Sequence, residues 1–302
     1  MQPLVQRLGY VALDVADIDA AIDDAQAVMG LSLVARDESH ALLTANARHA
    51  ELVFHQARES ALRTIGLEAL DGAQVDEVTR RARAAGVEIV SETPSLPVIA
   101  RAVTLRFREG HQIEVHTPMR RDQPLRYPGA GIHPRYIDHV NLAARDPALA
   151  AEEMMQVLGL KLSERTAGWE ISWMRAGDGR HHTLAFVKSE AAGLHHYSWE
   201  FADFADFKRL GDVLDALDRT LVWGPGRHGA GDNLFAYYVD AAGFLVECTA
   251  EMEVIDDPTF EARIVDPGEN LSNYKVVNRW GQLPSKAWME HFNPCAAVRE
   301  PV

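Results

Sequence analysis

Hydrophobic and polar positions repeat with two different periods along this chain. Residues 17–30 (DIDAAIDDAQAVMG) place apolar side chains at the spacing of one helix face, and Asp17 and Gly30 are suited to begin and end that helix. Residues 146–159 (DPALAAEEMMQVLG) have the same plan, with an aspartate and a proline at the start and Gly159 at the end. Short hydrophobic segments with period two follow each helix and predict β-strands.

These two helices belong to a longer repeat. The capping aspartates, the terminal glycines, and the strand residues Tyr10 and His139 all lie 129 positions apart, whereas Glu114 and Glu247 lie 133 positions apart. A slowly growing offset is typical of two diverged copies with small loop insertions. The order of strand and helix patterns in each copy predicts an α+β fold of tandem βαβββ modules, repeated at about 130 residues.

The repeat also predicts the domain boundaries. We expect two similar domains at residues 1–120 and 132–255, joined by a linker rich in Pro, Gly and Arg at residues 117–134. Residues 256–302 break the pattern, and we expect them to form a tail that packs on the second domain.

Composition narrows the classes of function. The chain has 302 residues and a formal net charge of -14, which argues against nucleic acid or an anionic membrane surface as partner. Two cysteines, at positions 248 and 295, exclude a disulfide framework and favour a cytoplasmic location. The start of the sequence has no pattern of a signal peptide, and no apolar run has the length of a membrane span.

Candidate metal ligands lie on three strands of the second copy. Side-chain alternation in IDHVNL, GLHHYSWEF and GFLVECT places His139, His196 and Glu247 each on one face of its strand. Two imidazoles and one carboxylate can hold one face of a non-haem Fe(II) ion and leave the other face open. Alternation alone does not decide between His195 and its neighbour His196. A histidine that stands alone in a strand is usually a core residue. The prediction of a metal site therefore rests on the three candidate ligands taken together.

The first copy lacks most of this ligand set. Tyr10 corresponds to His139, Thr64 corresponds approximately to His196, and only Glu114 matches its counterpart. We therefore expect the first domain to be a metal-free structural partner of the second.

A resemblance to a known family rests on these residues. The segment WGPGRHGAGDNLFAYYVDAAGFLVECTAE, together with IDHVNL and LHHYSWE, resembles the type I extradiol (catechol 2,3-) dioxygenases of the vicinal oxygen chelate superfamily, over roughly residues 5–255. The resemblance implies a curved mixed sheet forming an open barrel in each domain. It also implies that His139, His196 and Glu247 bind Fe(II), which Mn(II) can replace with the same ligands.

The same resemblance implies roles for further residues. His182 matches the family's acid-base histidine, although the adjacent His181 leaves that choice ambiguous by one position. His228 matches a histidine behind the ligands, and Tyr237 matches a tyrosine that hydrogen-bonds a substrate oxygen. Asn141 matches an asparagine near the oxygen site.

Two tryptophans bear on the substrate. Trp173 is a candidate for lining the pocket, with plain core packing as the alternative. Trp223 stands where relatives that accept acidic catechols have an arginine, so the resemblance favours an apolar or bulky catechol as the partner of O2. A homo-oligomer is expected because large assemblies are common in the family. Two other functions compete: a glyoxalase-like metal-dependent isomerase, and a protein that sequesters small molecules without catalysis.

Overall fold

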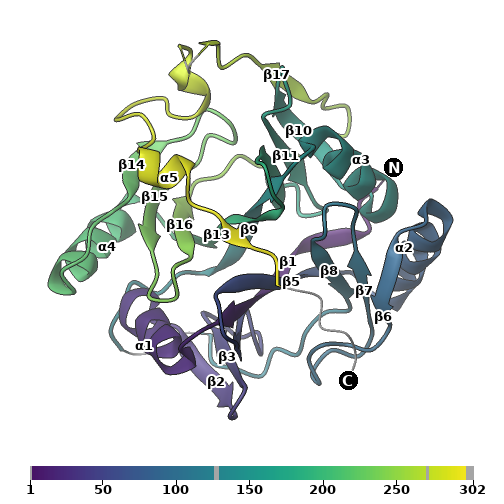
Figure 1. The fold of residues 1–302 in the computed structure, drawn as a ribbon, viewed down its shortest axis with the longest axis horizontal. Helices are drawn as coiled ribbons and strands as arrows, with labels where there is room; N and C mark the ends of the chain where they lie inside the picture. The colour runs from purple at the N-terminus through teal and green to yellow at the C-terminus, as the bar shows by residue number, and fades with distance from the viewer. Residues whose placement is uncertain (1, 126–128, 270–271, 297–302) are drawn as a thin grey trace.

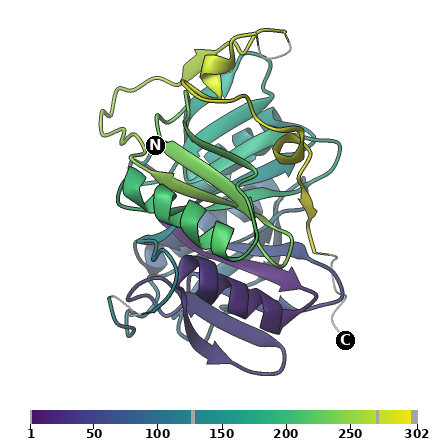
Figure 2. The ribbon, with the colours of Figure 1, turned by 90° about the vertical axis from the view of Figure 1, so that its left-hand side faces the viewer.

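The structure is a computed structural model that describes residues 2–125, 129–269 and 272–296. Two β-sheets follow one another along the chain, and helices lie at their outer faces (Figure 1). The side view in Figure 2 places the N-terminal half, in purple and blue, below the C-terminal half, in green and yellow. Among the described residues, no helix is both long enough and apolar enough to cross a membrane.

The N-terminal half forms a sheet with the strand order β2-β3-β4-β1-β5-β8-β7-β6. In chain order its elements are β1 (Val5–Val15), α1 (Ile18–Met29), β2 (Ser32–Arg36), β3 (His40–Thr44), β4 (Leu52–Gln56), β5 (Ala61–Ala69), α2 (Gly72–Ala85), β6 (Glu88–Ser91), β7 (Ala102–Arg106) and β8 (Gln112–His116).

The C-terminal half forms a second sheet with the order β14-β15-β16-β13-β9-β12-β11-β10-β17, and β18 pairs with β13 beside this path. Its elements are β9 (Tyr136–Ala144), α3 (Pro147–Leu158), β10 (Lys161–Thr166), β11 (Ile171–Arg175), β12 (Leu184–Lys188), β13 (Gly193–Glu200), α4 (Phe204–Ala216), β14 (Trp223–Arg227), β15 (Leu234–Val239), β16 (Leu245–Ala250), β17 (Arg263–Val265), η2 (Tyr274–Val276), α5 (Lys286–Met289) and β18 (Asn293–Pro294).

Each sheet consists of two βαβββ units. In the first sheet, β1 and β5 start the two units and pair antiparallel, while each runs parallel to the last strand of its own unit. Strands β9 and β13 have the same arrangement in the second sheet. The expected fold of tandem βαβββ modules in two similar halves is confirmed. The repeat of about 130 residues contains two such units, however, so four units follow one another in the chain.

The predicted helix ends are confirmed. The Asp17 carboxylate accepts a hydrogen bond from the first turn of α1, and Gly30 ends that helix with φ 67°. Asp146 caps α3 in the same way, and Gly159 ends it with φ 71°. A residue with a Cβ is strained at such positive φ values, which explains the glycine at both ends.

The four central strands β1, β5, β9 and β13 are buried along nearly their whole length. One continuous hydrophobic cluster includes residues of both halves. The described part of residues 256–296 adds β17 to the edge of the second sheet and pairs β18 with β13. The backbone of Cys295 also forms an isolated β-bridge with Leu62 of the N-terminal half. The central strands therefore place polar side chains in a buried part of the fold, where packing limits their movement.

Candidate metal centre

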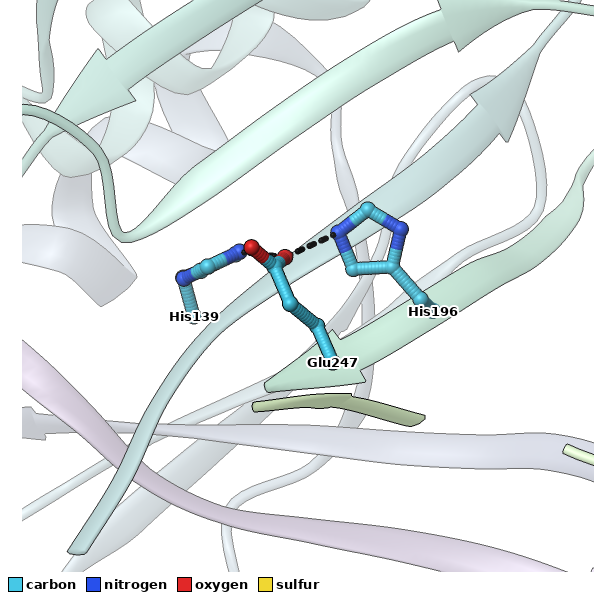
Figure 3. A group of neighbouring side chains, drawn as sticks. All are labelled: His139, His196 and Glu247. Carbon is cyan, nitrogen blue, oxygen red and sulfur yellow. Dashed lines mark hydrogen bonds and ion pairs between the residues drawn. The ribbon is translucent and has the colours of Figure 1, made fainter. Parts of the chain in front are cut away.

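Three neighbouring strands bring His139, His196 and Glu247 together. Their side chains come from β9, β13 and β16 and converge on one point (Figure 3). The Glu247 Oε2 atom lies 2.9 Å from His139 Nε2 and 3.1 Å from His196 Nε2. All three residues are buried, and one ligand atom from each lies within 4.8 Å of the others. Among the described residues this is the one group of His, Cys, Asp and Glu side chains that could hold a metal ion.

The outer side of each candidate ligand is also hydrogen-bonded. Asp138 Oδ2 lies 2.7 Å from His139 Nδ1, and the Asn233 side-chain amide donates to Glu247 Oε1 at 3.1 Å. His196 Nδ1 lies 2.7 Å from His195 Nδ1. Because a carboxylate can only accept, Asp138 keeps a proton on His139 Nδ1, so Nε2, which faces Glu247, is the nitrogen that can exchange its proton for a metal ion. Partners of this kind orient metal ligands in proteins, so the residues present fit a divalent ion.

Electrostatics favour a cation between these groups. Burial alone would raise the pKa of Glu247, but His139 and the neighbouring imidazoles outweigh it and hold that pKa well below its ordinary value. Burial lowers the pKa of His139, yet Glu247 and Asp138 together raise it to about 9. The carboxylate is therefore ionised at neutral pH, and its nearest neighbours are nitrogen atoms that bind either a proton or a metal ion.

Of the adjacent histidines 181 and 182, the structure brings His182 to the centre. Its ring lies 4.3 Å from the ring of His139, measured between centroids. His181 points away, with Nε2 3.2 Å from a Glu164 carboxylate oxygen and Nδ1 3.0 Å from His182 Nδ1. Burial, and then the proximity of His139, lowers the pKa of His182 well below its ordinary value. The ring of His182 is consequently neutral at neutral pH.

His228 and Tyr237 form a hydrogen-bonded pair beside the ligands. The Tyr237 hydroxyl lies 2.9 Å from His228 Nε2, and His228 Nδ1 lies 2.6 Å from the Val277 carbonyl oxygen. Burial, reinforced by the charge of Glu247, raises the pKa of Tyr237 well above its ordinary value. The phenol therefore keeps its proton and can donate a hydrogen bond.

A cavity opens next to the candidate ligands. Asn141 and Trp173 border it, together with His182, His228 and Tyr237. Trp223 does not border it: its ring stacks on Tyr237 with an interplanar angle of 12°, and its indole N–H donates to the Gln282 carbonyl. Trp223 therefore acts on this cavity through residues that it packs against, which include Tyr237 and Trp288.

The sequence patterns did not reveal several residues of the site. Asp138 directly precedes His139, and Asn233 lies inside the GRHGAGDNLF segment. Their positions in these motifs could have indicated that they belong to the site. Val276, Val277 and Trp288 border the cavity from residues 274–296, which we call the cover segment. The cover segment has no counterpart in the first copy, so the repeat could not point to it.

The N-terminal half has a different arrangement at the equivalent place. The Tyr10 hydroxyl donates to Glu114 Oε1 at 2.9 Å, and Ser95 and Thr104 donate to the other oxygen of the same carboxylate. The strand registers agree with the expected correspondence, because Ala12 pairs with Thr64 as Asn141 pairs with His196. Hydroxyl donors thus satisfy the buried glutamate where the second half has imidazoles.

The phenol ring of Tyr10 needs more room than an imidazole, and the strand opposite provides it. A Cβ at Gly66 would lie 2.1 Å from the Tyr10 ring, and the equivalent position in the second half is Ser198. Among the described residues, the N-terminal half contains no group that could hold a metal ion.

Replacing Tyr10 with phenylalanine is expected to destabilise the fold by about 1–3 kcal/mol, since Glu114 stays buried and loses one donor. Urea unfolding would measure this change. Tyr274→Phe is the matched control, because Tyr274 is partly exposed, and it should change stability by less than about 0.5 kcal/mol. Equal stability of the two variants would contradict the account of Glu114.

Known proteins share this fold and sequence. The family model described as "Glyoxalase/Bleomycin resistance protein/Dioxygenase superfamily" matches residues 7–115 and 136–248. Metapyrocatechase 2 of Cupriavidus necator is 36% identical over 123 residues, which are 40% of this chain and 38% of that protein. A manganese-dependent 2,3-dihydroxybiphenyl 1,2-dioxygenase of Geobacillus genomosp. 3 is 23% identical over 85% of this chain and 89% of that protein.

Two solved structures extend the comparison. The Mn(II)-bound glyoxalase of Novosphingobium aromaticivorans is 26% identical, with a TM-score of 0.81 over 92% of this chain and 91% of that chain. Homoprotocatechuate 2,3-dioxygenase of Brevibacterium fuscum, in complex with 3,4-dihydroxyphenylacetate, is 19% identical and shares the fold, with a TM-score of 0.86 over 97% and 93%. The predicted resemblance to extradiol dioxygenases is confirmed by these relatives, and the chain belongs to the glyoxalase/bleomycin resistance protein/dioxygenase superfamily.

Proposed function

We propose that this protein is an extradiol dioxygenase, which opens the ring of a catechol and inserts both atoms of O2. The observation that carries the proposal is the convergence of two imidazole nitrogens and one carboxylate oxygen beside a cavity, with the outer side of each ligand hydrogen-bonded. Relatives that match most of their length have the same activity in their names. The work of such an enzyme divides between a metal ion and the side chains around it.

His139, His196 and Glu247 would hold Fe(II) or Mn(II). When bound, such an ion supplies a Lewis acid with an open coordination face, where the two catechol oxygens and O2 can meet. A set of two neutral imidazoles and one carboxylate leaves one net positive charge, which favours a substrate that has lost a proton. A manganese-dependent relative makes either metal a reasonable expectation.

His182 would take a proton from a catechol hydroxyl. The Glu164 carboxylate accepts from His181 Nε2–H, which leaves His181 Nδ1 as an acceptor in the neutral ring. The proton between the two rings then belongs to His182 Nδ1, and His182 Nε2 carries the free lone pair. A neutral histidine with a fixed tautomer next to the ligands is suited to general base catalysis, and later to returning the proton as an acid.

Tyr237 and His228 would hold the substrate oxygens. Tyr237 keeps its proton at neutral pH, so its hydroxyl, which here donates to His228 Nε2, can turn to donate to negative charge that develops on the diol. Asn141 borders the same cavity, and its side-chain oxygen has no protein partner. Its amide is a candidate to orient the bound substrate on the side of the O2 position.

The substrate is an uncharged catechol with an apolar or bulky substituent. The residues that border the cavity include Ile171, Trp173, Val276, Val277 and Trp288, and none of its lining residues in the described part of the chain is a lysine or arginine. A substrate carboxylate would therefore be desolvated without a cationic partner. Trp223 contributes by packing against Tyr237, in place of the arginine that the sequence resemblance associates with acidic substrates.

A catechol panel tests the proposal. After anaerobic loading with Fe(II) or Mn(II), catechol and 3-methylcatechol should consume O2 and give a yellow ring-opened product. The kcat/KM for 3,4-dihydroxyphenylacetate should be at least about tenfold lower, which corresponds to about 1.4 kcal/mol for an unpaired carboxylate. Absence of O2 uptake with every catechol in the metal-loaded protein would refute the proposed reaction, and a preference for the acid would refute the substrate class.

A glyoxalase-like isomerase is the second candidate, favoured by the Mn(II)-bound glyoxalase of similar length. Such enzymes usually gather four metal ligands with more than one carboxylate. The cluster found among the described residues has three members and one carboxylate, which favours the dioxygenase. Turnover without O2 uptake would reverse this preference.

The remaining expectations belong to the same proposal. We expect the enzyme to act in the breakdown of aromatic compounds, in the cytoplasm, as a homo-oligomer. Domain boundaries at 1–120, 132–255 and 256–302 remain part of that expectation. Size-exclusion chromatography with light scattering would test the oligomeric state.

A further inference from the structure

The cover segment lies against the second sheet where two glycines make room for it. In Figure 1 it is the yellow chain that passes α5 and runs beside β13. A Cβ at Gly193 would lie 2.3 Å from the Asn293 carbonyl oxygen, and a Cβ at Gly229 would lie 2.0 Å from the Lys275 carbonyl oxygen. Neither glycine has the positive φ that would require glycine on its own account. What each of them provides is space for the backbone of the cover segment.

One contact of the cover segment leads to a candidate metal ligand. His195 is the extra residue of a β-bulge in β13, because Leu194 pairs with Leu142 and His196 pairs with Asn141. Bulges re-aim side chains, and here the imidazole turns toward the cover segment. His195 Nε2 lies 3.1 Å from the Trp288 carbonyl oxygen, and its ring also contacts the Trp288 ring.

The Trp288 carbonyl determines where the protons of both imidazoles lie. A carbonyl oxygen only accepts, so His195 Nε2 carries a proton, and in the neutral ring Nδ1 is an acceptor. His195 Nδ1 lies 2.7 Å from His196 Nδ1, so the proton between them belongs to His196. His196 then has its free lone pair on Nε2, the atom that faces Glu247. This is the tautomer that binds a metal ion.

A second carbonyl of the cover segment acts on His228 in the same way. The Val277 carbonyl accepts from His228 Nδ1–H at 2.6 Å, which leaves Nε2 to accept from the Tyr237 hydroxyl at 2.9 Å. Two carbonyl groups of one segment, 11 positions apart, thus orient two imidazoles, one hydrogen-bonded to His196 and the other to Tyr237.

We propose that the cover segment is a positioning element of the metal centre, and that His195 is the positioning residue through which the Trp288 carbonyl holds His196 ready for the metal. This inference rests on the metal site proposed above. It makes the affinity for the metal depend on whether residues 274–296 are docked, without any contact between that segment and the ion.

Metal affinity, measured with Mn(II) as the probe by electron paramagnetic resonance of the free ion, tests this directly. His195→Leu should weaken Mn(II) binding about 10–100-fold, the usual cost of losing a partner behind a metal ligand. His195→Gln should bind more tightly than His195→Leu, because the amide oxygen can accept the proton of His196. A purely structural role for His195 would not separate the two variants.

Docking is tested at Gly193. In Gly193→Ala the new methyl group displaces Asn293, so Mn(II) binding should weaken although His195 is intact. Gly211→Ala in α4 is the matched control, since a Cβ there has no neighbour within 4 Å, and it should bind as the wild type does. Amide exchange at Ala296, whose N–H donates to Leu62, reports whether the segment has moved.

The outcomes separate this inference from the proposed function. Wild-type protein that does not bind Mn(II) would refute the metal site itself. If the wild type binds Mn(II), three results would each overturn the positioning role alone. The first is wild-type Mn(II) affinity in His195→Leu, and the second is the same reduced affinity in His195→Gln as in His195→Leu. The third is wild-type affinity in Gly193→Ala together with faster amide exchange at Ala296.

Discussion

Replacing Glu247 with glutamine is expected to abolish stoichiometric metal binding while leaving the fold intact. Glutamine has nearly the same shape as glutamate but lacks the negative charge that faces Nε2 of both candidate imidazole ligands. Loss of a partner behind a metal ligand typically costs 10–100-fold in affinity, so loss of the ligand itself should cost more, on the order of 1,000-fold. Metal analysis after dialysis and Mn(II) titration would measure the change.

The chain contains its own control for this substitution. Glu114 is the same residue type at the equivalent strand position of the N-terminal half, and it is equally buried. Its carboxylate is hydrogen-bonded by Tyr10, Ser95 and Thr104, so Glu114→Gln should leave metal binding unchanged. Retention of metal by Glu247→Gln, or its loss in Glu114→Gln, would place the ion elsewhere.

Replacing His182 with phenylalanine should lower kcat by about 10²–10⁴-fold, the range typical for loss of a general acid-base group. The metal should remain bound, because His182 is not one of the three converging groups, although its ring contacts the ring of His139. Burial keeps the wild-type ring neutral at neutral pH, and the chain of hydrogen bonds through His181 leaves its Nε2 able to accept a proton. Steady-state O2 uptake and metal content, measured on the same samples, separate catalysis from ligation.

A histidine far from the centre is the control for that variant. His40 lies in β3 of the N-terminal half and is largely exposed, so His40→Phe should leave kcat and metal content at wild-type values. Unchanged kcat in His182→Phe would rule out the acid-base role. Loss of metal in that variant would show instead that His182 belongs to the ligand set.

Local features of this protein could be predicted because they depend on short stretches of sequence. The helix ends at Asp17, Gly30 and Gly159 follow from backbone geometry that a few residues determine by themselves. The repeat was visible because helix-like and strand-like hydrophobic patterns follow one another in the same order in both copies. The side-chain alternation along regular strands also predicted the faces from which His139 and Glu247 converge.

Alternation was not sufficient where a strand is irregular. The bulge at His195 shifts the register of β13, so counting by two could not decide between the two adjacent histidines, and the family resemblance was needed to choose His196. The pairing of two units into each sheet was also missed. That pairing arises from the contact of β1 with β5 and of β9 with β13, far apart in the sequence.

The sequence by itself determined the elements, the twofold repeat, the helix caps and the three candidate ligand residues, because each depends on neighbours along the chain or on a motif of fixed spacing. Only the tertiary structure decided that His182 rather than His181 faces the centre, that Trp223 supports Tyr237 from behind, and that carbonyls of the cover segment orient His195 and His228. These depend on side-chain directions and on backbone groups that any residue possesses. A carbonyl leaves no trace in a sequence, and its partner is chosen only when the chain has folded around it.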